Sequence, residues 1–405
     1  MQKRIVVTGV GVVSSIGIGK DDFWQALTAG KSGISPIESF DTADFPTHNG
    51  GEIKNFSAQE FILPEEAEKM GRVSCLALAA STLAINDASF KLDNFNRERI
   101  GVVFGTTMGE SQILEQLNAA WIKKGESAID AALICRYPCN VIAANTAVKF
   151  KLAGPNLTIP TACAAGNYSI GYACDLIKKG AADVMLAGGA DAFSRMAFIG
   201  FNRLLAVAPE KCQPFDKNRR GMMVGEGAGV LVLESLEGAL KRQSQIYAEV
   251  LGYGLSCDAR HMTAPYGEGI ARAIAKAIKE SNINPEEVDY ISAHGTGTPA
   301  NDKEECLAIK KVFPGRYKKI MVSSIKSMLG HTMGAASGIE AIACCLSLKN
   351  DLVPPTINFQ TPDPECDIDC VPNLSRKVKV NLALNNASAF GGNNACLVLR
   401  KFILS

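Results

Sequence analysis

LTIPTACAAGNYSIG, residues 157–171, is the stretch of sequence that decides the fold. An apolar run ends at Pro160–Thr161, small residues surround Cys163, and a helical pattern begins directly afterwards. Alanine and glycine allow a tight strand-to-helix elbow and leave room for a substrate beside the sulfur. Free N–H groups and the dipole at a helix N-terminus favour negative charge, so we expect a lowered pKa and a nucleophilic role for the Cys163 thiol. A buried packing cysteine is the alternative, and the elbow alone leaves both roles open.

Short apolar runs alternate with helix-length stretches on both sides of this elbow, which predicts an α/β fold with strands buried on both faces. The predicted strands are Ile5–Val7, Ile100–Phe104, Val184–Ala187, Val230–Leu233, Ala248–Tyr253, Tyr290–Ala293 and Ile320–Val322. The predicted helices are Val73–Asn86, Ser169–Lys179, Gly269–Glu280 and Ala335–Leu348. Val6–Gly11 and Ser292–Gly297 both read as a strand followed by a glycine turn. We therefore expect two similar halves, residues 1–250 and 251–405, packed into one body.

Composition excludes several classes of protein. The 405 residues carry a net charge of +1, which gives no reason to expect nucleic acid as a partner. The apolar run near the N-terminus is interrupted by Gly9 and Gly11, so it predicts a strand rather than a signal peptide, and no run is long enough to span a bilayer. Thirteen scattered cysteines without a C-x-x-C pair predict reduced packing thiols in a cytoplasmic protein and no metal site.

Three further segments hold residues that suit catalysis. SAHGTGTPAND (292–302) places His294 at the end of a predicted strand, before a loop rich in glycine and threonine. SSIKSMLGHTMGAASGIE (323–340) brings Lys326 and His331 close together, with Glu340 further along the following helix. AFGGNN (389–394) combines a double glycine with N–H groups that can serve as oxyanion donors. Each segment is ambiguous by itself: a loop histidine or a solvated lysine is an equally ordinary explanation.

In this order and spacing, however, the four segments resemble the ketosynthase family, and specifically the elongating type II β-ketoacyl-acyl-carrier-protein synthases with a Cys-His-His triad. The shared pattern is Cys163, then HGTGTP (294–299), KSMLGH (326–331) and FGGNN (390–394). The resemblance covers essentially the whole chain. It implies a thiolase-like five-layer αβαβα sandwich built from two duplicated halves, the first with the nucleophile and the second with both histidines, and normally a homodimer.

The resemblance also implies the roles of particular residues. Cys163 would take an acyl chain from acyl carrier protein, and His294 and His331 would stabilise the enolate formed when malonyl carrier protein loses carbon dioxide. No organic cofactor is implied. The N–H groups of Cys163 and Phe390 would form an oxyanion hole, with Phe390 also a gate. The remaining implied assignments are Lys326 with Glu340 beside His331, Asp302 and Glu305 near the second histidine loop, Thr296 and Thr298 at the pantetheine arm, and Met108 at the acyl pocket.

The sequence departs from the family pattern at several positions. Ala389 replaces the glycine before the gate, Asn393 replaces a threonine, and Ala164 and Ala165 make the floor beside Cys163 apolar. An alanine restricts the gate if its position needs positive φ.

The family meets its acidic carrier protein with basic residues near Pro64–Arg72. Here that segment, PEEAEKMGR, holds Lys69 and Arg72 among three glutamates, which would repel an acidic partner. Other basic residues could instead form the docking surface, namely Lys123, Lys124, Arg203, Lys217, Arg219 and Arg220. The alternative function is a ketosynthase of a specialised polyketide or polyene pathway.

Two less favoured functions are a thiolase and a catalytically silent partner subunit. Thiolases need a second cysteine in a C-x-G motif, whereas Cys396 lies beyond the glycines in a predicted strand. A silent subunit loses the nucleophile, whereas Cys163, Lys326 and both histidines are present here. A heterodimer with such a subunit remains open.

Overall fold

A strand of ten buried residues, β1 (Ile5–Ser14), opens the computed structural model, which describes residues 3–403. The strand continues through Gly9 and Gly11, where a turn was expected, with only a bulge between Val7 and Gly9. Both glycines face helix α3 (Arg72–Asp87). A Cβ at Gly9 would lie 2.3 Å from the Ala84 carbonyl oxygen, and one at Gly11 would lie 1.9 Å from that of Ala80. The predicted turn is therefore wrong: the glycines permit a close strand–helix approach.

One sheet contains two rows of five strands with the same order and the same directions. The first row is β6 (Asn156–Ile159), β5 (Ile100–Gly105), β7 (Val184–Asp191), β8 (Gly227–Ser235) and β1. The second row is β11 (Met321–Ser323), β10 (Tyr290–Ser292), β14 (Leu382–Ser388), β15 (Asn393–Lys401) and β9 (Ala248–Cys257). In each row the first three strands are parallel to one another, and the fourth strand is antiparallel to both of its neighbours. The rows meet where β1 pairs with β9.

This topology repeats, but not at the segments that the sequence suggested. β1 corresponds to β9, whereas Ser292 ends β10, the counterpart of β5. The match between Val6–Gly11 and Ser292–Gly297 is therefore coincidental. The division near residue 250 stays a prediction.

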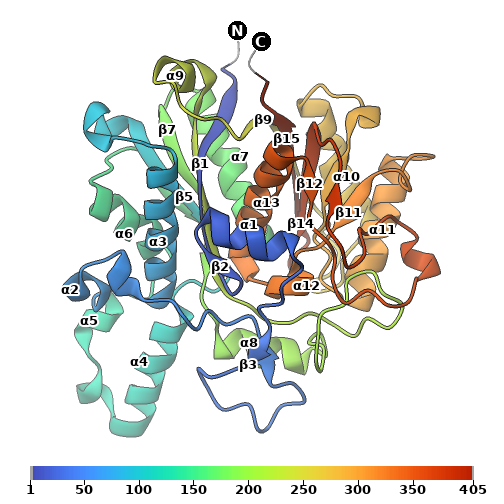
Figure 1. The fold of residues 1–405 in the computed structure, drawn as a ribbon. Coiled ribbons are helices and arrows are strands. Elements are labelled where there is room, and N and C mark those ends of the chain that lie inside the picture. The colour runs from blue at the N-terminus through green and yellow to red at the C-terminus, as the bar shows by residue number, and fades with distance from the viewer. Residues whose placement is uncertain (1–2, 404–405) are drawn as a thin grey trace.

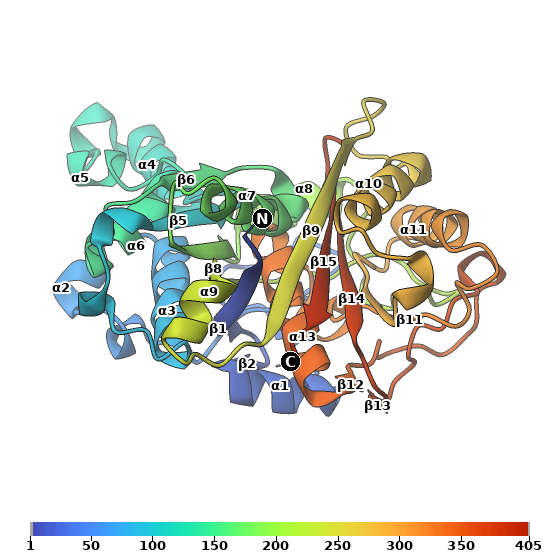
Figure 2. The ribbon, with the colours of Figure 1, turned by 90° about the horizontal axis from the view of Figure 1, so that it is seen from above.

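Helices form three layers around the two rows (Figures 1 and 2). α7 (Ala165–Lys178) and α13 (Ala336–Asn350) lie between the rows. α3 and α6 (Val141–Phe150) cover the outer face of the first row, and α10 (Gly267–Glu280) and α11 (Pro299–Val312) cover that of the second. This arrangement confirms the expected five-layer αβαβα sandwich.

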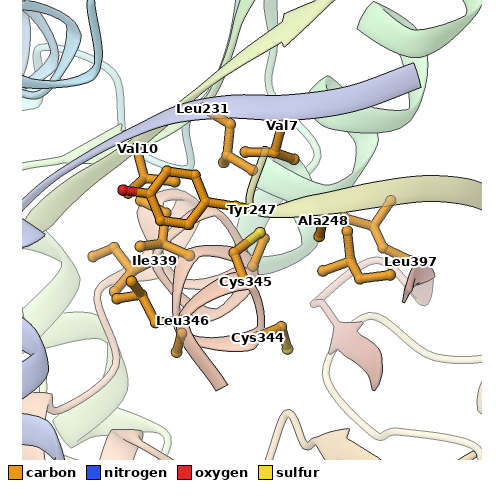
Figure 3. Packing of buried hydrophobic residues seen from close by; sticks show 14 of the residues in the cluster. Val7, Val10, Leu231, Tyr247, Ala248, Ile339, Cys344, Cys345, Leu346 and Leu397 are labelled. Carbon is orange, nitrogen blue, oxygen red and sulfur yellow. The ribbon is translucent and has the colours of Figure 1, made fainter. Parts of the chain in front are cut away.

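Buried side chains fill the space around the central helices. Figure 3 shows Cys344, Cys345 and Leu346 of α13 packed with Leu231 of β8 and Tyr247. Ten of the thirteen cysteines are buried and all are free thiols, which confirms that most of them are packing residues.

The remaining elements are short or peripheral. The helices are α1 (Lys20–Thr28), α2 (Pro64–Ala67), α4 (Ser111–Lys124), α5 (Ala131–Ile134), α8 (Arg195–Arg203), α9 (Leu236–Lys241) and α12 (Lys326–Leu329). The strands are β2 (Gly17–Ile18), β3 (Ser35–Pro36), β4 (Asn49–Gly50), β12 (Leu352–Val353) and β13 (Arg376–Lys377). Within residues 3–403, no helix has the length and apolar character needed to cross a membrane.

Candidate active site

Cys163 lies in the elbow that the sequence predicted. β6 ends at Ile159, a single 3-10 turn spans Ala162–Ala164, and α7 begins at Ala165. Ala162 has a φ of 51°, in the left-handed region that residues with a Cβ seldom adopt. Such a strained residue beside a nucleophile is typical of a functional elbow.

The environment of the Cys163 sulfur contradicts the expected lowered pKa. Burial raises the pKa of this thiol to about 12, and the opposing effect of the Lys326 charge is smaller. The loss of hydration therefore outweighs the attraction between a thiolate and the helix N-terminus. A buried thiol with a raised pKa must pass its proton to a base when it attacks.

His294 follows β10 on a loop that is held by a buried carboxylate. Glu305 on α11 accepts hydrogen bonds from the backbone N–H groups of His294 and Gly295, both at 2.8 Å. Burial raises the pKa of Glu305 to about 7. The Nδ1 atom of His294 has no hydrogen-bond partner within residues 3–403, so no contact fixes which ring nitrogen carries the proton.

His331 follows α12, and its tautomer is fixed. Its backbone N–H donates to the Met223 carbonyl at 2.6 Å, and its Nδ1 accepts a hydrogen bond from the Met333 backbone N–H at 3.2 Å. Because Nδ1 is an acceptor, the neutral ring carries its proton on Nε2. The His294 and His331 ring centroids are 5.3 Å apart with the planes at 81°. The two histidines therefore form one pair.

Burial lowers the pKa of both imidazoles well below 6.5, and the positive charge of Lys326 lowers it further. Lys326 forms an ion pair with Glu340 of α13, and both side chains are almost fully buried. Burial raises the pKa of Glu340, and the Lys326 charge opposes this shift. The ion pair thus keeps a positive charge near two neutral histidines.

Asp302, Thr296 and Thr298 shape the rest of the first histidine loop. The Asp302 carboxylate is buried and accepts hydrogen bonds from the backbone N–H groups of Phe215 and Gly297. The Thr296 and Thr298 hydroxyls are 2.9 Å apart, and that of Thr298 caps α11 by accepting from the Asn301 N–H. Asp302 is therefore structural, and both Asp302 and Glu305 hold the His294 loop rather than the second histidine loop, where they were expected. Both threonines face a cavity.

The predicted catalytic side chains meet at one cavity of about 320 Å³. Cys163, His294, His331, Thr296, Thr298 and Phe390 all line it. Phe390 is 37% exposed, its ring centroid is 5.5 Å from that of Phe201, and its backbone N–H has no acceptor within residues 3–403. Residues that the sequence left unnoticed also line the cavity, among them Phe201, Leu204, Leu205, Met222, Asp258 and Met262.

In the loop that carries Phe390, the residues with positive φ are glycines. Gly391 and Gly392 have φ values of 84° and 77°, whereas Ala389 has no positive φ. Ala389 is therefore compatible with this conformation, and its methyl group adds no backbone strain here.

Met108 does not line the cavity. Its backbone N–H instead donates to Asp191 at 3.0 Å. Asp191, at the end of β7, also accepts from the Thr106 hydroxyl and from the N–H groups of Thr107 and Gly334. This carboxylate joins the loop after β5 to the segment after His331. The sequence offered one sign of it, a charged residue directly after a buried glycine-rich strand.

The expected docking residues are only partly available. Arg72 donates to the buried Glu226 carboxylate at 2.7 and 2.8 Å, and Arg219 is a buried partner of Asp363. Lys149 pairs with Glu66 at 2.5 Å. Arg219 is therefore wrong as a docking residue, because its side chain is buried, and the charge of the partly exposed Arg72 is already paired with Glu226.

The cavity is suited to acyl transfer through a covalent intermediate, because it contains a thiol, two neutral imidazoles and an unpaired amide donor. The thiol attacks a carbonyl, an imidazole accepts its proton, and N–H groups stabilise the oxyanion.

Comparisons with known proteins agree with this chemistry. Residues 2–239 match the family model "Beta-ketoacyl synthase, N-terminal domain", and residues 247–360 match the model "Beta-ketoacyl synthase, C-terminal domain". The chain is 43% identical over 410 residues to 3-oxoacyl-[acyl-carrier-protein] synthase 2 of Synechocystis sp., with 99% of each chain covered.

Two solved structures are also similar over the full length of both chains. One is the ishigamide ketosynthase/chain length factor, with a TM-score of 0.96 and 44% identity. The other is a type II PKS acyl-carrier protein in complex with its ketosynthase, with a TM-score of 0.93 and 34% identity. Both in sequence and in structure, the chain belongs to the β-ketoacyl synthase family.

Proposed function

We propose that the chain is a 3-oxoacyl-acyl-carrier-protein synthase that lengthens an acyl chain by two carbons through decarboxylative condensation. The observation that carries this proposal is the single cavity lined by Cys163, His294, His331 and Phe390. A site that holds an acyl thioester and stabilises an enolate uses all of these groups together.

In the first half-reaction the Cys163 sulfur attacks the thioester carbonyl of an acyl carrier protein, and a neutral imidazole of the cavity accepts the thiol proton. The oxyanion accepts hydrogen bonds from the N–H groups of Cys163 and Phe390. The carrier thiolate leaves and takes a proton, so the acyl chain remains on Cys163 as a thioester.

In the second half-reaction malonyl carrier protein enters. The carboxylate leaves as carbon dioxide, and the electron pair moves toward the thioester oxygen, which accepts hydrogen bonds from His294 and His331. The fixed Nε2–H tautomer of His331 supports this role. The enolate carbon then attacks the Cys163 thioester, the sulfur leaves, and the product is a β-ketoacyl chain on the carrier.

The other residues support these steps. The Lys326–Glu340 pair keeps positive charge beside both histidines, and Glu305 and Asp302 hold the His294 loop. Thr296 and Thr298 offer hydroxyls to the pantetheine arm. Met108 is retained as an acyl-pocket residue only if a second subunit extends the cavity toward it.

We also propose that the protein acts as a dimer in the cytoplasm. β6 is an edge strand, and the exposed Val148, Leu157 and Tyr172 lie on β6 and on its flanking helices. An edge strand with apolar neighbours is suited to a subunit contact.

The decisive test is intact-mass analysis with acyl-loaded carrier protein. Wild-type protein gains the acyl mass and Cys163→Ala does not. With malonyl carrier protein, His294→Ala and His331→Ala slow the release of carbon dioxide. Acylation of the Cys163→Ala variant, or unchanged decarboxylation in both histidine variants, contradicts the proposal.

A second candidate is the same reaction in a specialised polyketide or polyene pathway. The chain is 44% identical to the ishigamide ketosynthase/chain length factor and 43% identical to the Synechocystis synthase, so identity does not separate the two pathways. A panel of acyl chain lengths and carriers separates the two pathways. A primary synthase accepts saturated chains, whereas a polyene ketosynthase prefers unsaturated ones.

A further inference from the structure

Three polar side chains lie buried beneath the Cys163 elbow, where α7, α13 and β14 meet. Asn167 is in the first turn of α7, Ser337 is in the first turn of α13, and Asn385 is in β14. All three are fully buried, and none of them lines the cavity. We call these three residues the buried polar cluster.

Ser337 connects α13 to the backbone on both sides of the elbow. Its hydroxyl oxygen accepts a hydrogen bond from the Asn167 backbone N–H at 3.0 Å, and the hydroxyl donates to the Cys163 carbonyl oxygen at 3.4 Å. The N–H groups in the first turn of a helix have no carbonyl partner within that helix. Ser337 therefore caps α7 from another helix, and it holds the carbonyl of the nucleophile at the same time.

Asn167 and Asn385 form a reciprocal pair that connects α7 to β14. Asn167 Nδ2 donates to the Asn385 backbone carbonyl oxygen at 2.9 Å, and Asn385 Nδ2 donates to Asn167 Oδ1 at 2.8 Å. Asn385 Nδ2 also donates to the Ser337 backbone carbonyl oxygen at 2.8 Å. Because both of its acceptors are carbonyl oxygens, these bonds fix the orientation of the Asn385 amide. The cluster thus joins three segments that are far apart in the sequence.

Small residues bring the same segments into close contact. Ala164, directly after the nucleophile, packs against Ala387 of β14 in one buried apolar group. A Cβ added at Gly166 would lie 2.8 Å from the Ser337 hydroxyl oxygen. The hydrogen bonds of the cluster therefore act across a tightly packed junction, where a small displacement of one segment is passed to the next.

The polar character of the cluster is costly at a buried junction. Asn385 Oδ1 has no hydrogen-bond partner in the part of the chain that the structure describes, and an unsatisfied buried oxygen destabilises a fold. Apolar side chains would avoid this cost. Hydrogen bonds, however, have defined lengths and directions, whereas the hydrophobic effect is non-directional. The cluster is therefore better suited to fixing positions than to adding stability.

From these contacts we propose that Asn167, Ser337 and Asn385 are positioning residues that set the distance between the two N–H groups of the oxyanion hole. The proposal rests on the proposed function, in which the N–H groups of Cys163 and Phe390 stabilise the oxyanion. Asn167 follows Cys163 by four residues, and Asn385 precedes Phe390 by five. The asparagine pair therefore links the two segments that carry the donors. Such a link is needed because both donors must lie about 3 Å from one oxygen.

The test compares two reactions of the same sulfur. Acylation of Cys163 by an N-acetylcysteamine thioester forms an oxyanion, whereas alkylation by iodoacetamide is a displacement that forms none. We expect Asn385→Ala and Ser337→Ala each to slow acylation at saturating thioester by about 10- to 100-fold, since loss of a complete oxyanion donor costs about 10²- to 10³-fold. Alkylation at the same pH should stay unchanged. The half-saturating thioester concentration should also stay unchanged, because the cluster does not line the cavity.

Ser347→Ala is the matched control. Ser347 lies on the same helix as Ser337 and is fully buried, and its hydroxyl has no hydrogen-bond partner within residues 3–403. Its loss should change neither reaction. The double variant Asn167→Ala/Asn385→Ala should be acylated no more slowly than the slower single variant, because each single substitution already breaks the shared pair.

Three outcomes overturn the proposal. Equal losses in acylation and alkylation would mean that the cluster supports the sulfur rather than the oxyanion donors. Unchanged acylation in Ser337→Ala and Asn385→Ala would mean that the cluster has no part in the reaction, and either variant decides this alone if the other does not fold. Multiplying effects in the double variant would mean that the asparagines do not act as a pair. If no thioester acylates the wild-type protein, the proposed function itself fails; if wild type is acylated and the variants match it, the positioning role alone fails.

Discussion

Met333 donates its backbone N–H to Nδ1 of His331 at 3.2 Å. Met333 has a φ of 53° and begins the 3-10 turn before α13, just as Ala162, with a φ of 51°, begins the turn before α7. The same elbow therefore occurs once in each row of the sheet. In the first row it presents a nucleophile, and in the second row it fixes the tautomer of a histidine.

The first prediction concerns that tautomer. His331 is neutral with its proton on Nε2, because the Met333 N–H occupies Nδ1 and burial lowers the pKa of the ring. In the ¹⁵N spectrum of histidine-labelled protein, His331 should show the Nε2–H pattern from pH 6 to 8. His331→Ala should slow malonyl decarboxylation by about 10²-fold, as for the loss of one oxyanion donor.

His48 provides the control, because it is exposed and does not line the cavity. His48→Ala should leave decarboxylation unchanged. A proton on Nδ1 of His331, or a cationic ring at pH 7, would contradict the assignment.

The second prediction concerns stability and pH. Burial lowers the pKa of His294 in the folded chain well below 6.5, whereas the unfolded chain takes up the proton near pH 6.5. Protonation thus favours the unfolded state, so the contribution of His294 to stability falls as pH falls below 6.5. When the pH is lowered from 7 to 5.5, wild type should lose roughly 1 kcal/mol of unfolding free energy relative to the His294→Asn variant.

Urea unfolding at the two pH values measures this shift. Buried carboxylates such as Glu305, whose folded pKa is raised, change the unfolding free energy with pH in the opposite direction. Both proteins contain these carboxylates, so subtracting one unfolding free energy from the other cancels their contribution. A difference that does not change with pH would mean that the His294 ring is solvated.

Much of the candidate site could be predicted from local sequence. The elbow around Cys163 is visible because small residues follow an apolar run, and the histidine loops are visible because each motif is contiguous. The protonation of Cys163 was not predictable in this way. Its pKa depends on burial of the sulfur and on the charges of Lys326, Asp191 and Glu340, which are distant in sequence.

In the fold, too, local features were predicted and contacts between distant residues were not. The predicted strands and helices all overlap observed elements, because their apolar patterns are local. Gly9 and Gly11 were misassigned to a turn, because the helix that they face lies about seventy residues further along the chain. The ion pair of Arg72 could not be predicted for a similar reason, since its partner Glu226 lies 154 residues away.

The third prediction concerns the reactivity of Cys163. Because burial raises the pKa of the thiol to about 12, alkylation by iodoacetamide should be slow at pH 7 and rise about tenfold per pH unit up to pH 10. The double variant Lys326→Met/Glu340→Gln should react more slowly still. It removes the Lys326 charge that lowers the pKa, and it avoids the cost of an unpaired buried carboxylate, about 3 to 5 kcal/mol.

The modified residue is identified by peptide mass, with Cys163→Ala as the blank. A rate that is already constant above pH 6 would show that Cys163 is a thiolate, and the burial argument would then be wrong.

The fourth prediction concerns Asp191, a positioning residue. Its carboxylate accepts four hydrogen bonds from Thr106, Thr107, Met108 and Gly334, and burial raises its pKa to about 6. An asparagine offers one oxygen, and its NH₂ group would face backbone N–H donors. Asp191→Asn should therefore lower the free energy of unfolding by about 2 to 4 kcal/mol. It should also slow decarboxylation more than Cys163 acylation, because Gly334 adjoins Met333, the residue that holds His331.

Asp183→Asn is the matched control, because it removes a carboxylate from an exposed pair with Arg99 and should cost no more than about 1 kcal/mol. Urea unfolding gives the first quantity, and carbon dioxide release against acyl mass gain gives the second. If Asp191→Asn slows both half-reactions equally, the carboxylate supports the whole cavity rather than the His331 elbow. If its stability loss matches that of Asp183→Asn, the four hydrogen bonds contribute no more than a surface ion pair.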